Sequence, residues 1–436
     1  MSQIATLSVN GVGVLESHNS VDDRVMLMFR PGDRPIIPRK GRSRAYVYSC
    51  RAGYVAERLD LLGFTLDRTE RSFRDCLMSV RRRLREIGRD VPTEVRSTYD
   101  SGLEYLRGYN YARWREALTA RFGSKDRARV GSKRSAKTRY LSLVTDSTGD
   151  KGQSLEDEFF VGFPALDYGA WDILELMRGV VASTAPSAPV MLDYGELVTG
   201  GYVSADDELC DPASLEGLGI SERILVLTEG SSDSRIIRKS MQVLRPHLVD
   251  YFGFMDFELS NAAGSANQLV SNIKAFIGAG IRYRVTAVFD NDTASEEAPR
   301  ALSSCRIPEN IKVVRLPDVE IARAYPTIGP QGRTSLDVNG LACSIEMYIC
   351  PDLLRDAKGT LIPVQWRGFS EGLSKYQGEV LHKRELAAKF ETLLDDVLHD
   401  PVKRKEHDWT AMSAVIDRIL GAHRSCTVTH PKHLPI

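Results

Sequence analysis

Acidic residues stand directly after two apolar runs of this sequence, in an arrangement that could hold a metal ion. Glu229 follows the run at 223–227. Asp290 and Asp292 follow the run at 283–289. Alternate residues of an extended strand point the same way, so these two aspartates can present their carboxylates toward one point. Hard oxygen ligands suit Mg2+ or Mn2+, and three convergent carboxylates without a cation would repel one another, so the pattern predicts a cation site.

The same side chains could instead serve the fold. Acidic and hydroxyl side chains after a strand also cap the helix that follows. The residues that could do only this are Ser231, Ser232, Asp233 and Asp292. The two acidic segments follow the ends of two strands in one region, and this combination favours the cation site over the capping role. Asp233 is a further candidate ligand.

Strand and helix patterns alternate around these residues. Strands are expected at 223–227, 251–257, 283–289 and 311–316, and helices at 232–248, 266–278 and 294–303. The continuous run of Ile, Leu and Val that precedes Glu229 is typical of a strand buried on both faces of a parallel sheet. Ligands of such sheets bind at the carboxyl ends of the strands. Region 221–350 is therefore expected to be an α/β domain with a mostly parallel sheet.

The length of 436 residues predicts at least two cores, and we expect a multidomain α/β chain. Four other regions are expected. Region 1–50 has short strands, including the apolar stretches 4–9 and 25–29, and region 51–150 is a basic helical domain that ends in a linker. Region 151–220 is an acidic connecting region, and region 351–436 is a mainly helical extension. Outside the α/β region, an antiparallel pair of helices is expected between 54 and 90. Further helices are expected at 92–122, 171–181, 381–398 and 412–420. The helix at 92–122 carries an aromatic stripe with Tyr109 and Trp114, which we expect to be core.

Composition excludes several classes of protein. Hydrophobic residues make up 42% and charged residues 27% of the chain, as in ordinary globular proteins and unlike disordered or fibrous ones. The apolar runs are far shorter than the roughly 18 residues of a membrane helix, and no secretory signal is recognised, so we expect a cytoplasmic protein without a membrane partner. Seven cysteines without a C-x-x-C pair argue against a disulfide framework and a structural zinc site.

Charge is segregated along the chain although its total is zero. Residues 68–139 hold 20 Lys or Arg and 9 Asp or Glu, whereas residues 140–220 hold 2 and 15. The basic block could be a solvated helix face, an internal partner of the acidic block, or a surface for phosphate backbones. The candidates for nucleic-acid binding are Arg81, Arg82, Arg83, Lys133 and Arg134.

The acidic motifs resemble those of the Toprim domain of bacterial primases, topoisomerases and the nucleases of the overcoming-lysogenization-defect group. The family glutamate falls on Glu229 in ILVLTEGSSD, and its D-x-D falls on Asp290 and Asp292 in VTAVFDNDT. In the nuclease branch, the resemblance implies a further metal ligand at Glu346 in CSIEMYI and a catalytic lysine at Lys383 in HKRELAAKF. The N-terminal half, especially ERLDLLGFTLDRTERSF, resembles that of the HEPN/Toprim-associated bacterial proteins.

The resemblance implies a Mg2+- or Mn2+-dependent nuclease that acts on DNA or RNA, in the context of defence against phage, as a homo-oligomer or with a partner protein. A second interpretation is a binding or regulatory subunit that uses the same fold without turnover. HEPN ribonucleases pair Arg with a nearby His, but no histidine lies between His18 and His247. The spacing recurs at Arg418 with His423 and at Arg424 with His430, so a third interpretation is a metal-free RNase at the C-terminus.

Overall fold

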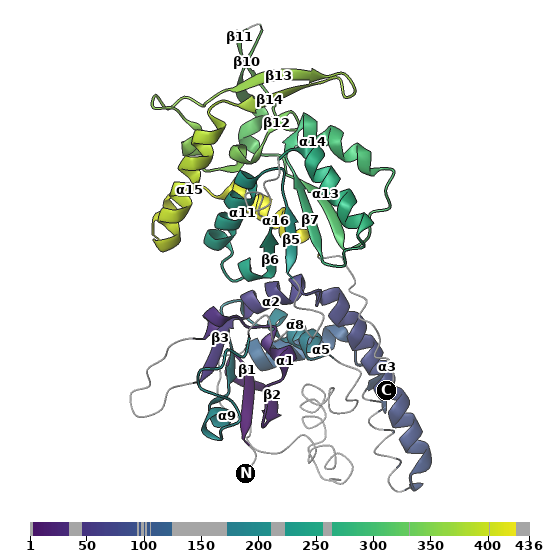
Figure 1. Cartoon of the computed structure of the whole chain (residues 1–436). Coiled ribbons are helices and arrows are strands. Elements are labelled where there is room, and N and C mark those ends of the chain that lie inside the picture. The colour runs from purple at the N-terminus through teal and green to yellow at the C-terminus, as the bar shows by residue number, and fades with distance from the viewer. Residues whose placement is uncertain are drawn as a thin grey trace. The chain divides into compact units, whose positions relative to one another are not determined.

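The computed structural model describes residues 3–34, 46–93, 96, 100, 103–104, 106–123, 172–210, 223–255, 264–330, 332–400 and 402–423. Contacts within the chain divide it into two compact units, Met1–Ser221 and Glu222–Ile436, and each is described by itself (Figure 1). No helix of the described residues is long and apolar enough to cross a membrane.

The first unit contains an antiparallel sheet of four strands in the order β2-β1-β4-β3. The strands are β1 (Ile4–Val9), β2 (Val12–His18), β3 (Val47–Arg51) and β4 (Pro189–Asp193). The helices are α1 (Asp23–Met26), α2 (Ala52–Leu61), α3 (Leu66–Asp90), α5 (Tyr111–Gly123), α8 (Ile173–Ala182) and α9 (Gly195–Thr199). A short 3-10 turn, η1, covers Pro31–Asp33. Strand β4 inserts between β1 and β3, so the segment after 188 completes a sheet begun at residue 4.

Two predictions for this unit are wrong. The stretch 25–29, expected as a strand, is helical where α1 forms, because the carboxylate of Asp22 accepts the N–H of Arg24 and caps it. A buried apolar run has the same sequence signal in a helix as in a strand. The helix expected over 92–122 is interrupted before α5, where Gly108 forms a turn.

The aromatic stripe of the first unit is core, as predicted. Trp114 is 1% exposed, and its ring lies 5.3 Å from that of Phe73. Gly179 of α8 faces this ring, and a Cβ at that position would lie 2.4 Å from the Cη2 atom of Trp114. The glycine therefore permits the close approach of α8 to α5, and the ring is out of reach of a nucleic acid.

The second unit is built on a parallel sheet in the order β6-β5-β7-β9. The strands are β5 (Ile224–Leu227), β6 (Phe252–Phe254), β7 (Val285–Phe289) and β9 (Ile311–Arg315). The helices between them are α11 (Ser231–Leu244), α13 (Ala266–Gly278) and α14 (Thr293–Glu297), with 3-10 turns η3 (Val249–Tyr251) and η4 (Ala298–Leu302). The predicted α/β alternation is confirmed, and it fits a Rossmann-like domain. The strand order reverses between β5 and β7, where ligands of such sheets bind.

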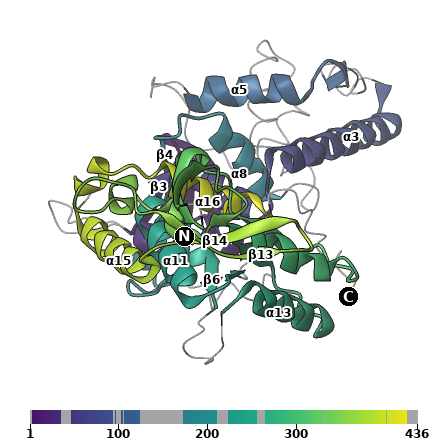
Figure 2. The same ribbon diagram turned by 90° about the horizontal axis from the view of Figure 1, so that it is seen from above.

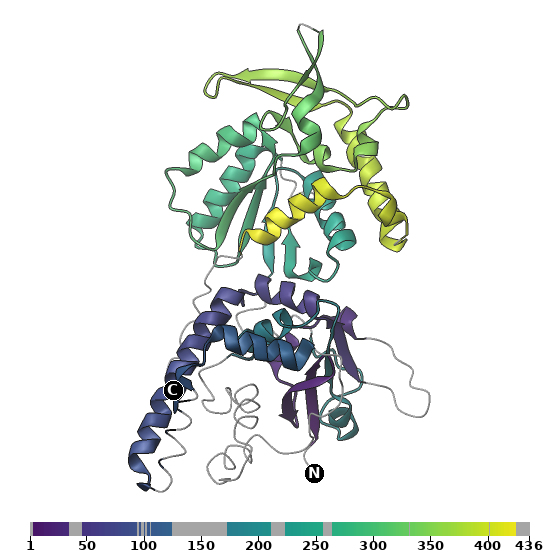
Figure 3. The same ribbon diagram turned by 180° about the vertical axis from the view of Figure 1, so that it is seen from behind.

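The C-terminal part of this unit contains further strands and helices. The strands are β8 (Asn291–Asp292), β10 (Tyr325–Gly329), β11 (Gly332–Leu336), β12 (Ala342–Cys343), β13 (Val364–Ser370) and β14 (Lys375–Val380). The helices are α15 (Lys383–His399) and α16 (Thr410–Gly421), with 3-10 turns η5 (Glu320–Ala324), η6 (Ile345–Tyr348), η7 (Pro351–Leu354) and η8 (Lys403–Glu406). Strand β8 pairs with β12, and a second sheet has the order β11-β10-β13-β14. Figure 3 shows the C-terminal helix (yellow) lying across the parallel sheet on the side away from α13.

The extension 351–436 is less helical than expected. Helices α15 and α16 confirm the two predicted helices. Strands β13 and β14, which Figure 2 shows from above, were not predicted. Their pairing contains a β-bulge between Trp366 and Gly368. The bulge interrupts the alternation of apolar and polar residues by which a strand is recognised in a sequence.

Candidate functional site

The carboxyl ends of β5 and β7 bring Glu229 and Asp290 together. The two strands are parallel neighbours, with Leu227 opposite Ala287. The Glu229 side chain reaches across this edge, and its Oε1 atom accepts the N–H of Asp290 at 2.9 Å. The hydroxyl of Ser295 donates to the same oxygen at 2.5 Å. Two residues far apart in sequence are thus fixed side by side at the switch point of the sheet.

Asp292 and Asp233 both cap helices, as the structural alternative predicted. The Oδ1 atom of Asp292 accepts the N–H of Ser295 at 2.8 Å and caps α14. Its Oδ2 atom accepts the amide of Gln377 at 2.8 Å. Asp233 accepts the N–H of Gly230 at 3.0 Å near the start of α11. The capping fixes the orientation of both carboxylates, and it leaves each with lone pairs for a further ligand.

Asp290 has the least compensated carboxylate of the site. It is 8% exposed, and no described residue donates a hydrogen bond to its carboxylate. Burial, followed by the charges of Asp233 and Glu229, raises its pKa well above the usual range. A buried carboxylate without donors binds a proton or pairs with a cation, and the charge of Lys383 opposes the rise in this pKa only in part.

The neighbouring carboxyl groups share this environment. Burial, followed by the charge of Glu346, raises the pKa of Asp233 to about 7. Burial also raises the pKa of Glu229, against the hydrogen bonds from Ser295 and Asp290. Their pKa values are raised together because the carboxyl groups are buried close to one another.

Lys383 and Glu346 join this group from the C-terminal part of the unit. Glu346 lies on η6 and is 1% exposed, and the hydroxyl of Ser344 donates to its Oε2 atom at 2.7 Å. Lys383 opens α15, and its Nζ atom lies 3.5 Å from the same oxygen. Burial acts to lower the pKa of Lys383, but the charges of Glu346, Asp290 and Asp233 outweigh it and raise that pKa.

Helix α15 is held in place by ion pairs to α11. Lys239 of α11 lies 2.8 Å from Asp395 and 3.6 Å from Glu391 of α15. Arg235 adds a contact of 3.4 Å to Glu391. Helix α11 begins beside Glu229. Because α15 packs against α11, its first residue, Lys383, lies near the carboxylates.

Three residues of the site were missed from the sequence. Ser295 holds Glu229, and Gln377 of β14 holds Asp292. Arg315 closes β9, and its guanidinium donates to the carbonyls of Asp290 at 3.2 Å and of Asp292 at 2.6 Å. The strand-end rule that found Asp290 also applies to Arg315, but no local signal links Gln377 to a carboxylate 85 residues away.

The donor chemistry of this site fits a hard divalent cation. The nearby side chains offer carboxylate oxygens, and the Asp290 carboxylate lacks a donor. Within the described residues, however, no three His, Cys, Asp or Glu side chains are arranged closely enough to hold a metal ion. The described carboxylates are therefore not arranged as a ready three-ligand metal site.

The basic candidates of the first unit have different surroundings. The guanidinium of Arg81 donates to the carbonyls of Leu106 and Tyr109, so it serves the fold, whereas Arg82 is exposed. The side chain of Arg83, and Lys133 and Arg134, lie outside the described residues. Arg68 pairs with Glu175 at 2.6 Å, so part of the basic block is an internal partner of the acidic block.

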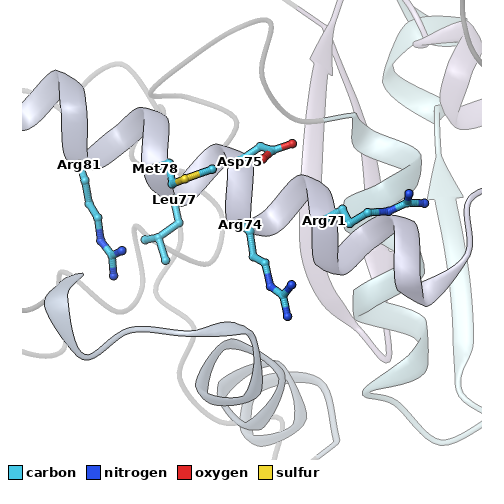
Figure 4. A pocket seen from close by; sticks show the side chains of 6 residues that line it. All are labelled: Arg71, Arg74, Asp75, Leu77, Met78 and Arg81. Atoms are coloured by element: carbon cyan, nitrogen blue, oxygen red, sulfur yellow. The ribbon is translucent and has the colours of Figure 1, made fainter.

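A surface hollow of about 490 Å3 lies along α3. Its lining residues are Arg71, Arg74, Asp75, Leu77, Met78 and Arg81. Figure 4 shows Arg74, Leu77 and Arg81 extending to one side of the helix and Asp75 to the other. Arg74 is already paired with Glu70, so the positive charge of this hollow is partly compensated.

The Arg418–His423 pair does not form a catalytic site. His423 is 3% exposed, and its Nε2 atom lies 3.1 Å from the hydroxyl of Thr286 on β7. Burial, followed by the charges of Arg284 and Lys312, lowers its pKa to about 4. An imidazole in the core cannot reach a substrate, whereas Arg418 is exposed. The second pair, Arg424 with His430, lies outside the described residues.

Comparison with known proteins identifies the first unit. The family model described as HEPN/Toprim N-terminal domain 1 matches residues 1–215. No curated protein and no solved structure matches the chain. Residues 1–215 of this chain therefore belong to the HEPN/Toprim N-terminal domain 1 family.

Proposed function

We propose that the chain is a divalent-metal-dependent nuclease that hydrolyses phosphodiester bonds at the carboxylates of the second unit. The observation that carries this proposal is the convergence of Glu229 and Asp290 at adjacent parallel strand ends, with the Asp290 carboxylate buried and without a donor. Such a group is suited to a cation, and the strand ends are where α/β sheets bind ligands. The HEPN/Toprim association of the first unit agrees with a nuclease.

Each residue of the site has a separate role in this proposal. Glu229, Asp290 and Asp292 would hold Mg2+ or Mn2+, with Asp233 and Glu346 beside them. The bound ion would supply an activated water and would stabilise the leaving oxygen. The ammonium of Lys383 would neutralise charge on the phosphate. Arg315 fixes the main chain that carries both aspartates, so it is a positioning residue.

The test is cleavage of labelled DNA and RNA by the full chain. Cutting should require Mg2+ or Mn2+ and stop with a chelator. The isosteric change Asp290→Asn should lower the cleavage rate at least about 100-fold, because it removes a metal-binding charge at unchanged shape. Asp250→Asn is the matched control, since Asp250 is exposed and precedes the amino end of β6. Undiminished cutting in the chelator, or by Asp290→Asn, would contradict the proposal.

A second candidate function is a nucleic-acid-binding or regulatory subunit of a defence complex. It is favoured by the two hydrogen bonds that already occupy Asp292 and by the lack of an assembled three-ligand set in the described part of the chain. This candidate predicts binding of nucleic acid without cleavage in either metal. The same assay therefore separates the two functions.

A further inference from the structure

One face of the β13–β14 hairpin carries polar side chains that contact α14. Lys375 and Gln377 alternate on β14, and Ser370 stands opposite Lys375, so these three side chains project from the same face. Lys375 lies 2.9 Å from Glu296, and the hydroxyl of Ser370 donates to Glu297 at 2.8 Å. This face of the hairpin is therefore bound to α14, the helix that directly follows β8.

The side-chain amide of Gln377 bridges two groups at the start of α14. Its Oε1 atom accepts the main-chain N–H of Ala294 at 2.8 Å, and its Nε2 atom donates to Oδ2 of Asp292 at 2.8 Å. A main-chain N–H can only donate, so the first bond fixes which end of the amide is the oxygen. The NH2 group is thereby turned toward the carboxylate.

The main chain on both sides of Gln377 is also fixed. The carbonyl of Tyr376 accepts the hydroxyl of Thr293 at 2.6 Å. The N–H of Gly378 donates to the carbonyl of Leu341 at 3.2 Å, beside β12, which pairs with β8. The amide is therefore held next to the carboxylate by the fold as well as by its own hydrogen bonds.

The two oxygens of the Asp292 carboxylate each accept one hydrogen bond. The N–H of Ser295 donates to Oδ1, and Gln377 donates to Oδ2. A carboxylate oxygen has two lone pairs, so each oxygen keeps one for a further ligand. Two donors at fixed positions oppose rotation of the carboxylate and hold the remaining lone pairs in one direction. Removal of a group that orients a metal ligand in this way typically changes metal affinity about 10- to 100-fold.

We propose that Gln377 is a positioning residue of the carboxylate site, which holds Asp292 in the orientation that binds a divalent cation. This inference rests on the proposed function, because it concerns the same site, and it gives the β13–β14 hairpin a part in metal binding. Positioning is favoured over competition with the cation, because Gln377 uses one lone pair of one carboxylate oxygen.

The experiment measures the Mn2+ affinity of the full chain by electron paramagnetic resonance, without nucleic acid. Gln377→Met nearly keeps the length of the side chain and removes both polar groups, so it should bind Mn2+ about 10-fold more weakly. Gln377 is half-buried, so this variant should fold, and urea unfolding checks that it does. Thr293→Val is the control, because it removes a bond between α14 and the hairpin without a change at the carboxylate. It should bind Mn2+ like the wild type.

A double-mutant cycle with Asp292→Asn tests whether Gln377 acts through Asp292. Residues that act on a ligand through each other are not additive. The effect of Gln377→Met on Mn2+ affinity should therefore disappear in the Asp292→Asn background. An equal loss in both backgrounds would overturn the positioning role.

The outcomes separate this inference from the proposed function. Unchanged affinity of Gln377→Met would overturn the inference, even if the wild type cuts with Mn2+. Tighter binding would overturn it as well, because Gln377 would then compete with the cation, and equal losses in Gln377→Met and Thr293→Val would reduce Gln377 to a tie within the fold. A wild type that binds no Mn2+ would overturn it together with the metal site. A selective loss in Gln377→Met supports it even if no nucleic acid is cut.

Discussion

The ammonium of Lys383, at the start of α15, lies 3.5 Å from the carboxylate of Glu346, which belongs to η6. The two partners differ in exposure, since the lysine side chain is 37% exposed and that of the glutamate only 1%. The buried carboxylate therefore depends on the lysine for compensation, whereas the lysine can remain solvated.

Removal of this lysine should destabilise the second unit. Lys383→Met leaves Glu346 buried with the Ser344 hydroxyl as a remaining donor, and we expect a loss of about 1–2 kcal/mol in the free energy of unfolding. Glu346→Gln in the same background should recover most of the loss. Urea unfolding measures both, with Lys389→Met on the exposed side of α15 as the control. If Glu346→Gln fails to rescue, the pair has no role in stability.

Asp233 should make the metal-free protein less stable as the pH rises. Its pKa is about 7 in the folded chain, above the unfolded value of about 3.9, so the folded chain holds a proton that the unfolded chain lacks between these pH values. Stability from this group is present at low pH and is lost as the pH rises through 7. The urea midpoint of Asp233→Asn should therefore fall less from pH 5 to pH 7 than that of the wild type. Equal falls in the two proteins would contradict the burial of this charge.

His423 should make the protein less stable as the pH falls, the opposite of the effect of Asp233. Its pKa of about 4 in the folded chain lies below the unfolded value of about 6.5, so the unfolded chain takes up a proton first as the pH falls. This contribution to stability is present above pH 6.5 and is lost toward pH 4, by up to about 3 kcal/mol. His423→Gln should flatten the acid limb of the stability profile. His399→Gln, an exposed histidine at the end of α15, should not.

Arg81 and Arg82 should respond differently to neutralisation. Arg81→Gln removes the donor to the carbonyls of Leu106 and Tyr109, and should cost about 1–2 kcal/mol of stability. Arg82→Gln should leave stability unchanged, weaken binding to many sequences equally, and reduce the salt slope of binding by about 1. Fluorescence anisotropy across a salt series measures the second effect. An unchanged slope for Arg82→Gln would show that this part of α3 does not contact phosphates.

The sequence predicts the carboxylate edge well because it depends on local signals. Apolar runs identify β5 and β7 and place Glu229 and Asp290 after the carboxyl ends of their strands. The direct pairing of β5 with β7, which brings the two residues together, is a long-range contact that only the structure shows. The carboxylates of Asp233 and Asp292 carry capping signals that are also local. The strand ends and the caps needed no knowledge of distant contacts.

Other parts of the structure depend on contacts that no local pattern encodes. Gln377 reaches Asp292 from a strand whose pairing with β13 includes a bulge, so neither the strand nor its partner is visible as simple alternation. The segment 25–29 is buried completely, and burial on all sides removes the periodicity that separates helix from strand. His423 has an Arg–His spacing, but tertiary packing against Thr286 decides its role.

The most direct test of the cation site is an anomalous difference map from crystals of the full chain soaked in Mn2+. We expect one strong peak within bonding distance of carboxylate oxygens of Glu229 and Asp290, with Asp292 as the next ligand, and no peak in crystals of Asp290→Asn. A map without a peak at this edge of the sheet, in which Lys383 is still the cation beside the carboxylates, would contradict the cation site.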